Sequence, residues 1–292
     1  MGKKVKKPIT VFTIFSHILL ALFFIFVLIP FVMIIFTAFK TTPEINDMPN
    51  RTLIQRILPE NWTNFSNIVS VWNGTASQLN GVPFYKFIIN SLIVTLCSLI
   101  PSMILALTAA YGLAKYDFPC KNIIFYLLLG LVMIPMEMIS IPLFMMVSKV
   151  HLVNSYIGMM IPSFISAFGT FLLKEAMEPI PNSYIEAARI DGAGEFMIFR
   201  KIIIPMITSA LVTFVVIKCT WSWNELFWPL LVVSTEGKKT VTLGLAKFSN
   251  DLFKEYGQLN SAVLLSIIPL LAIFIFAHKQ IKTGLMGSGI KG

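Results

Sequence analysis

Long stretches without a charged residue are the feature that most restricts what this chain can fold into. No Asp, Glu, Lys or Arg occurs from Val11 to Phe39 or from Phe87 to Ala114. A helix needs about 20 mostly apolar residues to cross the hydrocarbon layer of a bilayer. Both stretches exceed that length, which predicts that each is a membrane-spanning helix.

Four more stretches follow the same pattern, so the sequence predicts six spans. The third contains one acid, Glu137, and the fifth contains Lys218. The predicted spans are Val11–Phe39, Phe87–Ala114, Asn122–Ser148, Val150–Leu173, Ile202–Trp223 and Tyr256–Ala277. Only 13% of the residues are charged, whereas a soluble domain has about a quarter. The sequence therefore predicts an all-α integral membrane protein, with residues 1–292 as a single transmembrane domain.

The distribution of Lys and Arg predicts the orientation of these spans. Basic residues are more than twice as dense in one set of connecting segments, namely 1–10, 114–121, 178–202 and 279–292. They are sparser in the other set, namely 37–83, 148–156 and 221–259. Basic loops stay on the cytoplasmic side, so both termini and the tail 279–292 are predicted to be cytoplasmic. The first outer loop, 40–83, and the last outer loop, 229–255, then face outward. The net charge of +9 fits this topology better than nucleic-acid binding.

The motifs of the common catalytic and nucleotide-binding sites are absent from the sequence. The segment Gly237-Lys238-Lys239 lacks the hydroxyl and the upstream glycine of a phosphate-binding loop. The three histidines are scattered along the chain, which makes a metal site improbable. We therefore predict a chain that is not an enzyme, has no catalytic residues and binds no cofactor itself. If the chain takes part in active transport, the energy source lies elsewhere.

The cytoplasmic segment 178–202 has the pattern of two short helices joined by a turn. Ser183 is predicted to cap the first helix, with Glu186 three residues later as a capping box requires. Gly192 is the predicted left-handed stop, and Glu195 begins the second helix. Such a rigid element outside the membrane could dock on a partner. The alternative interpretation is a capped connector between two spans.

One motif in this segment resembles a known family. The segment contains a spaced pattern: Glu186-Ala187-Ala188, three residues, Gly192, nine residues and Ile202-Ile203-Ile204-Pro205. This pattern is similar to the coupling motif of ABC importer permeases, with Ile204 at the usual leucine position. The resemblance implies a type I ABC importer (MetI-like) permease fold, whose loop fits a groove on a cytoplasmic ATPase. The coupling residues that it implies are Glu186, Ala187, Ala188, Asp191, Gly192 and Ala193.

Three further segments resemble the carbohydrate branch of that family, specifically its maltose-type, MalG-like permeases. They are the pair Asn90-Ser91, the segment from Trp223 to Leu230 and the ending from Gly284 to Gly292. The implied partners are a second, homologous permease, two copies of an ABC ATPase that hold the ATP and Mg, an extracytoplasmic binding protein and a carbohydrate. The implied location is a bacterial plasma membrane.

The same resemblance assigns roles to the last outer loop and the tail. Residues 231–255 would reach into the binding protein and help to displace the sugar. The tail would insert between the ATPase subunits through Gly284, Gly287, Lys291 and Gly292.

Aromatic and polar residues near the outer end of the fifth span could line a sugar path. Sugars stack on aromatic faces and form hydrogen bonds through their hydroxyls. Aromatic rings and polar side chains occur together in Trp221, Trp223, Asn224, Glu225 and Trp228. The alternative is an aromatic belt at the membrane surface, where Trp is enriched.

Three residues elsewhere in the spans complete the set of polar candidates. Asn90 is a further candidate for the path. Glu137 is either a path residue or a structural carboxyl that a neighbouring helix satisfies, since acids inside spans are often functional. Lys218 is predicted to extend its amine to the outer surface.

Two other classes of transporter remain as alternatives. A permease of the same superfamily could carry peptides, amino acids or an inorganic anion instead of sugar. A secondary transporter would be expected to show paired charges inside its spans and internal symmetry. The sequence shows only Glu137 well inside a span and no internal repeat, which disfavours this second class.

Overall fold

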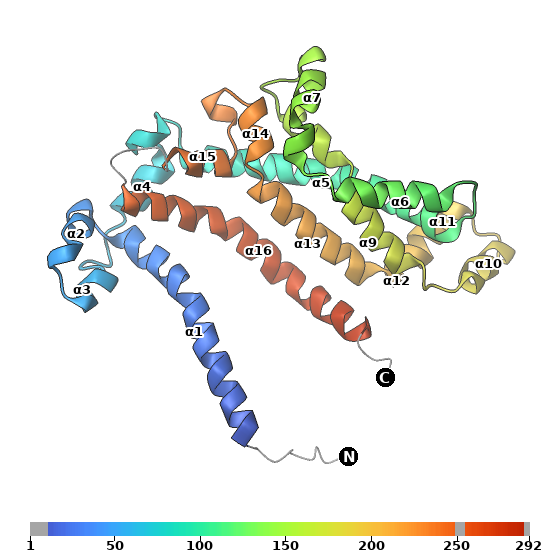
Figure 1. The fold of residues 1–292 in the computed structure, drawn as a ribbon, viewed down its shortest axis with the longest axis horizontal. Helices are drawn as coiled ribbons and strands as arrows, with labels where there is room; N and C mark the ends of the chain where they lie inside the picture. Colours follow the sequence, from blue (N-terminus) through green and yellow to red (C-terminus); the bar gives the residue numbers. More distant parts are fainter. Residues whose placement is uncertain (1–10, 249–254, 289–292) are drawn as a thin grey trace.

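The computed structural model describes residues 11–248 and 255–288, and every regular element in these ranges is a helix. The three longest are α1 (Val11–Phe39), α5 (Phe84–Lys115) and α16 (Tyr256–Ser288), shown in Figure 1. A helix satisfies its own backbone hydrogen bonds, which apolar surroundings require. The all-α prediction is therefore confirmed.

Four helical segments of the described chain are long and apolar enough to cross a membrane, and two bent pairs of helices raise the number to six. The four are Phe12–Phe39, Phe84–Lys115, Tyr156–Met177 and Tyr256–Ile275. The bent pairs are Lys121–Val132 with Met136–Lys149, at 99°, and Glu195–Met206 with Thr208–Asn224, at 80°. The six predicted spans thus correspond to helical segments, of which the third and fifth are sharply bent.

The third span breaks at Pro135. Helix α6 (Lys121–Val132) ends just before this residue, and α7 (Met136–Lys149) begins directly after it. Proline has no N–H donor and restricts the residue that precedes it, so it ends one helix and begins the next. Pro142, by contrast, lies inside α7 and does not end it.

The fourth and fifth spans are assembled from shorter pieces. The fourth begins later than predicted, because His151 and Asn154 adopt positive φ in a turn. It consists of α8 (Tyr156–Met160), a 3₁₀ turn (Ile161–Phe164) and α9 (Ala167–Met177). The fifth comprises α11 (Glu195–Ile198), a π-helical turn (Phe199–Ile203), α12 (Ile204–Met206) and α13 (Thr208–Asn224).

Helix α5 is the central element of the packing. It contacts α9 and α13 along its length, and α13 also packs against α16 (Figure 1). A Cβ atom added at Gly169 of α9 would lie 2.2 Å from the ring of Phe214 in α13. Only glycine allows these two helices to approach so closely.

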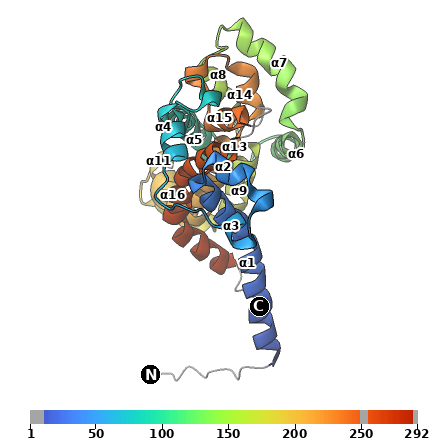
Figure 2. The ribbon, with the colours of Figure 1, turned by 90° about the vertical axis from the view of Figure 1, so that its left-hand side faces the viewer.

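Helix α1 leaves the rest of the molecule, as Figures 1 and 2 show. Its end near Ala38 packs against α16 and α4, whereas most of its apolar side chains are exposed. Exposed apolar surface on this scale is unsuited to water and suits lipid or a partner helix in a membrane.

Short helices form the two long loops, and a separate short helix lies at the opposite end of α5. The loop after α1 contains α2 (Thr42–Asn46), α3 (Leu53–Ile57) and α4 (Ser66–Asn73), with 3₁₀ turns at Met48–Asn50 and Ser77–Leu79. The loop after α13 contains α14 (Phe227–Val232), a 3₁₀ turn (Glu236–Lys238) and α15 (Val241–Lys247). Helix α10 (Asn182–Ile190) lies far from both loops (Figure 1).

Candidate functional site

Helix α10 contains the first three predicted coupling residues, and the other three follow its end directly, but the helix begins differently from the expectation. The helix starts at Asn182, and Pro181 occupies the cap position without a side-chain hydrogen bond. Ser183 therefore lies inside the first turn, and the predicted capping box with Glu186 is wrong. Proline fixes an extended entry into the helix, which replaces the side-chain cap.

The end of α10 has the geometry that the sequence predicts. Gly192 has φ of +79°, and its N–H donates to the carbonyl of Arg189 at 3.0 Å. The N–H of Ala193 donates to the carbonyl of Ala188 at 2.9 Å, which completes a Schellman motif. No atom lies within 4 Å of a Cβ added at Gly192. The backbone angle, and not a lack of space, therefore requires glycine here.

The motif residues divide into an exposed set and a packed set. Glu186, Ala187, Asp191 and Gly192 are exposed, whereas Ala188 and Ala193 pack against the core cluster of α5, α9 and α13. The exposed set forms a small surface at the end of the molecule that a partner could contact.

Lys115, at the end of α5, ties down the chain that enters α10. Its Nζ donates to the carbonyl of Ile180 at 2.5 Å and to that of Glu178 at 3.3 Å. The side-chain oxygen of Asn182 lies 3.5 Å away. These carbonyls follow the end of α9, where helix carbonyls lack intrahelical donors and attract a cation.

The carboxylate of Glu195 ties the other end of α10 to α5. One oxygen pairs with Nε of Arg189 at 2.7 Å, and the other accepts hydrogen bonds from Tyr116 at 2.5 Å and Tyr111 at 3.2 Å. The hydrogen bond to Glu195 raises the pKa of Tyr116, and the same carboxylate raises the pKa of Arg189. Together with Lys115, this cluster fixes both ends of α10 to one long helix.

Sequence reasoning missed this set of contacts. Lys115 and Tyr116 looked like ordinary flanks of a span, and Glu195 like a residue of the helix that follows the motif. The available signal was the set of polar side chains at the end of the second predicted span. A single sequence, however, does not show which distant segments contact each other.

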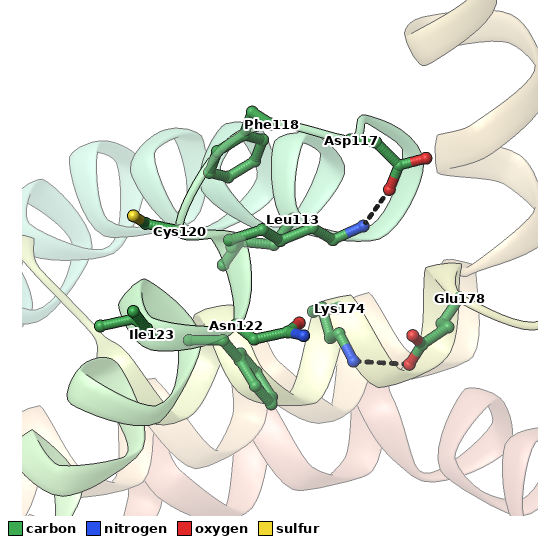
Figure 3. A pocket seen from close by; sticks show the side chains of 10 residues that line it. Leu113, Asp117, Phe118, Cys120, Asn122, Ile123, Lys174 and Glu178 are labelled. Atoms are coloured by element: carbon green, nitrogen blue, oxygen red, sulfur yellow. Dashed lines mark hydrogen bonds and ion pairs between the residues drawn. The ribbon is translucent and has the colours of Figure 1, made fainter.

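A pocket of about 490 Å³ lies next to these contacts, between α5, α6 and α9 (Figure 3). Lys121 pairs with Asp117 at 3.2 Å, and Lys174 pairs with Glu178 at 2.5 Å. Because both lysines are paired with carboxylates, the pocket offers little unbalanced charge to a ligand.

A second pocket, of about 230 Å³, lies where α13 and α14 meet α5, α7 and the fourth span. It is lined by Val94, Met136, Met159, Pro162, Ser163, Lys218, Trp221, Ser222, Glu225, Trp228 and Pro229. This mixture of aromatic faces with hydroxyl, carboxylate and amine groups is the chemistry that binds sugars. We call it the α13–α14 pocket.

Two of the six predicted path residues line the α13–α14 pocket. Trp228 is buried and donates through Nε1 to the carbonyl of Gly158 at 3.0 Å. The carboxylate of Glu225 accepts from the backbone N–H of Trp228 at 3.1 Å. Both side chains are therefore held in place. Trp221 also lines the pocket, and its ring contacts that of Phe168.

The other predicted path residues lie elsewhere. Trp223 is buried in a core cluster with Phe84 and Phe87. Asn224 is exposed and donates to the carbonyl of Thr220 in its own helix. Glu137 is exposed in the first turn of α7 and does not line the pocket. The spacing along the chain was therefore a poor guide to which of these side chains share a cavity.

Asn90 is an anchor for the last outer loop. Its side-chain N–H groups donate to the carbonyls of Gly237 and Lys239, both at 2.9 Å, and its oxygen accepts from Tyr156 at 2.7 Å. The residue is buried, and these bonds use both ends of its amide. These bonds give it a structural role, and its role in the sugar path stays a prediction.

One further bond holds the same loop to α5, and ion pairs within the loop brace it. Ser91 accepts from the backbone N–H of Val241 at 2.8 Å. Glu236 pairs with Lys239 at 2.7 Å and also with Lys247. Burial acts to raise the pKa of Glu236, but the bonds to the two lysines outweigh it and lower that pKa. The part of this loop that the structure describes is therefore fixed to α5.

The prediction for Lys218 is wrong. The side chain does not extend to the outer surface but is buried in α13, where Nζ donates to the carbonyl of Ser163 at 2.5 Å. That carbonyl lies in the 3₁₀ turn at the break before α9, where a donor is needed.

The predicted tail interface lies only partly within the described residues. Gly284 and Gly287 belong to the last turns of α16, which ends at Ser288. Lys291 and Gly292 lie outside the described residues.

Comparison with known proteins identifies the family. Residues 88–281 match the family described as the binding-protein-dependent transport system inner membrane component. The arabinooligosaccharides transport system permease protein AraQ of Bacillus subtilis is 32% identical over 228 residues, which cover 78% of this chain and 79% of that relative. The sn-glycerol-3-phosphate transport system permease protein UgpE of Yersinia enterocolitica is 27% identical over 277 residues, or 94% of this chain and 96% of the relative.

The fold also matches a solved structure. A chain in the crystal structure of a bacterial ABC transporter involved in the import of the acidic polysaccharide alginate has a TM-score of 0.78 and 22% identity. The match covers 95% of this chain and 99% of the other. The chain therefore belongs to the family of inner-membrane components of binding-protein-dependent transport systems, and it is a multi-pass permease with the fold of an ABC importer.

Proposed function

We propose that this chain is one permease subunit of an ATP-driven importer that takes up a carbohydrate, most simply an oligosaccharide. An extracytoplasmic binding protein delivers the solute, and two copies of an ABC ATPase hydrolyse ATP with Mg on the cytoplasmic side. A second, homologous permease completes the path. The chain itself is a transport subunit and performs no chemical step. The family and the names of the relatives AraQ and UgpE support this assignment.

The attachment of α10 to α5 is the observation on which the mechanism rests. The exposed residues of α10 would contact the ATPase, and both ends of α10 are bonded to the end of α5 through Lys115 and Glu195. Further along α5, Asn90 holds the last outer loop. A displacement of α10 is therefore passed to α5, and from there to the outer loop, through contacts that do not require the chain to unfold.

This arrangement fits alternating access with both termini in the cytoplasm of a bacterial cell. Closure of the ATPases would move α10 and α5 as one unit and open the cavity outward. The last outer loop, positioned by Asn90, would then meet the binding protein as it releases the sugar. The coupling residues are Glu186, Ala187, Asp191 and Gly192 on the surface, with Ala188 and Ala193 packed beneath them.

Uptake into proteoliposomes tests the proposal. The chain is reconstituted with the second permease, the ATPase and the binding protein, with ATP inside the vesicles and the binding protein outside. We expect uptake of a labelled arabino-oligosaccharide or another sugar that requires ATP, the binding protein and all subunits, and no uptake of a labelled dipeptide. Dipeptide uptake under the same conditions would favour the alternative, a permease for a non-sugar solute. Sugar uptake driven by an ion gradient without ATP would contradict the mechanism.

A further inference from the structure

Lys218 is a buried cation that forms no direct ion pair within the described part of the chain. It lies within the fifth span and is 8% exposed. None of the ion pairs in the described part of the chain includes it, so no carboxylate there lies within 4.0 Å of its amine. Charged residues inside spans are costly, and they generally mark a solute path or a pairing partner.

The structural hydrogen bond to Ser163 accounts for only part of the hydrogen-bonding capacity of Lys218. The hydrogen bond to the carbonyl of Ser163 uses one of the three N–H donors of the amine. A neutral donor could satisfy that carbonyl without burying a charge. The remaining donors belong to a side chain that lines the α13–α14 pocket.

The other groups in the pocket match a sugar ring. Trp221 and Trp228 supply aromatic faces, and Ser222 supplies a hydroxyl. Glu225 accepts from the N–H of Trp228, and its carboxylate lies more than 4.0 Å from the amine of Lys218. A ligand must therefore satisfy a cation and a carboxylate separately. Sugar hydroxyls can donate to the carboxylate, while an acidic group can accept from the cation.

The volume of the pocket sets the size of the ligand. Pockets for whole drug-sized ligands usually enclose about 300–1,000 Å³, and this one encloses about 230 Å³. It therefore suits one sugar ring with its substituent and not a whole oligosaccharide.

We propose that the α13–α14 pocket is a solute subsite for one sugar unit that carries a carboxylate or a phosphate, and that Lys218 binds this acidic group. The inference rests on the proposed function and deepens it, because it names an acidic sugar as the substrate class. It also assigns solute contact to this permease and not only to its partner. Lys218 is then the residue that sets specificity.

Matched pairs of solutes test the proposal in the complete transporter. The first pair is digalacturonate and its uncharged methyl ester, and the second is glucose 6-phosphate and glucose. Uptake of each is measured for the wild type, Lys218→Met and Lys218→Arg with the same binding protein. Because the binding protein is unchanged, its own selectivity cancels when the ratio of acidic to neutral uptake is compared between variants.

We expect the wild type to take up at least one acidic solute of the two pairs. Lys218→Met should lower the ratio of acidic to neutral uptake by about 10-fold or more, because a charge-assisted hydrogen bond is lost. Lys218→Arg should keep most of the ratio. The pair that responds tells whether a carboxylate or a phosphate is recognised. If the ratio of acidic to neutral uptake is unchanged in Lys218→Met, Lys218 only holds the carbonyl of Ser163, and the proposal is overturned.

The wild-type measurement keeps the test decisive if Lys218→Met fails to assemble. A wild-type transporter that takes up only the neutral members overturns the acidic subsite and leaves sugar import standing. A wild-type transporter that takes up none of these sugars, yet imports a dipeptide with ATP, overturns the proposed function and this inference together.

Discussion

Replacement of Gly192 by alanine isolates the contribution of one backbone angle to the coupling element. Gly192 has φ of +79°, whereas Gly194, two residues later, has φ of −72°. Both glycines are exposed, and no atom lies within 4 Å of a Cβ added at either. Gly194→Ala is therefore a matched control that adds the same methyl group without the left-handed conformation.

The structure fixes the expected size of the effect. An L-residue in the left-handed region costs about 1–2 kcal/mol, and the open space around Gly192 adds no steric cost. Gly192→Ala should therefore weaken the Schellman turn by about 1–2 kcal/mol, a factor of about 5–30 in its opening equilibrium. Gly194→Ala should be neutral or stabilising by up to about 1 kcal/mol, because alanine restricts the unfolded chain.

Hydrogen–deuterium exchange of the reconstituted transporter measures this difference. The amides of residues 192 and 193 donate the two bonds of the turn. In Gly192→Ala they should exchange about 5–30 times faster than in the wild type, and solute-stimulated ATPase activity should fall. Gly194→Ala should match the wild type in both assays. Equal effects of the two substitutions would refute the argument from the backbone angle.

Three further substitutions test other parts of the structure. Asn90→Ala removes the three hydrogen bonds of a buried side chain and should lower stability by about 2–3 kcal/mol in thermal unfolding. Asn224 is exposed, so Asn224→Ala should change stability by less than about 0.5 kcal/mol. Gly169→Ala should destabilise by about 1–3 kcal/mol through overpacking, and adding Phe214→Leu should restore part of the loss. The lowered pKa of Glu236 means that its ion pairs stabilise the fold at neutral pH and cease to do so as the pH falls below about 4.5. The difference in Tm between wild type and Glu236→Gln should therefore be present at pH 7 and shrink progressively as the pH is lowered below about 4.5.

The number of spans and the Gly192 turn could be predicted because each depends on local chemistry. Uncharged runs of sufficient length leave a chain few alternatives to spanning helices. A glycine directly after a helical pattern, such as Gly192, predicts a helix stop. The break at Pro135 was also foreseeable, since proline cannot continue the backbone ladder. That only Pro135, and not Pro142, interrupts the helix depends on packing that the sequence does not reveal.

The positions of the polar side chains could not be predicted in the same way. Asn90 and Lys239 are separated by well over a hundred residues and meet only because α5 and the last outer loop fold together. Lys218 lies close enough to the end of its span for the amine to reach water, yet the broken fourth span presents the carbonyl of Ser163 to it. The preference of a lysine for water was therefore outweighed by a partner from a distant segment. Trp223 and Trp228 differ in the same way, because the helix break after Asn224 places Trp223 in a core cluster and Trp228 in the α13–α14 pocket.

The most direct test of the central claim is the ATPase activity of the reconstituted transporter with binding protein and sugar, for the wild type and Glu186→Ala. Glu186 is exposed on α10 and forms none of the contacts that hold the helix to α5, so its loss should leave the fold intact. Lys149→Ala, an exposed change at the far end of α7, is the control. If α10 couples the permease to the ATPase, Glu186→Ala should insert normally and lose most of the solute-stimulated activity, while the control keeps it. Full stimulation in Glu186→Ala would show that the segment 178–202 is only a connector between spans.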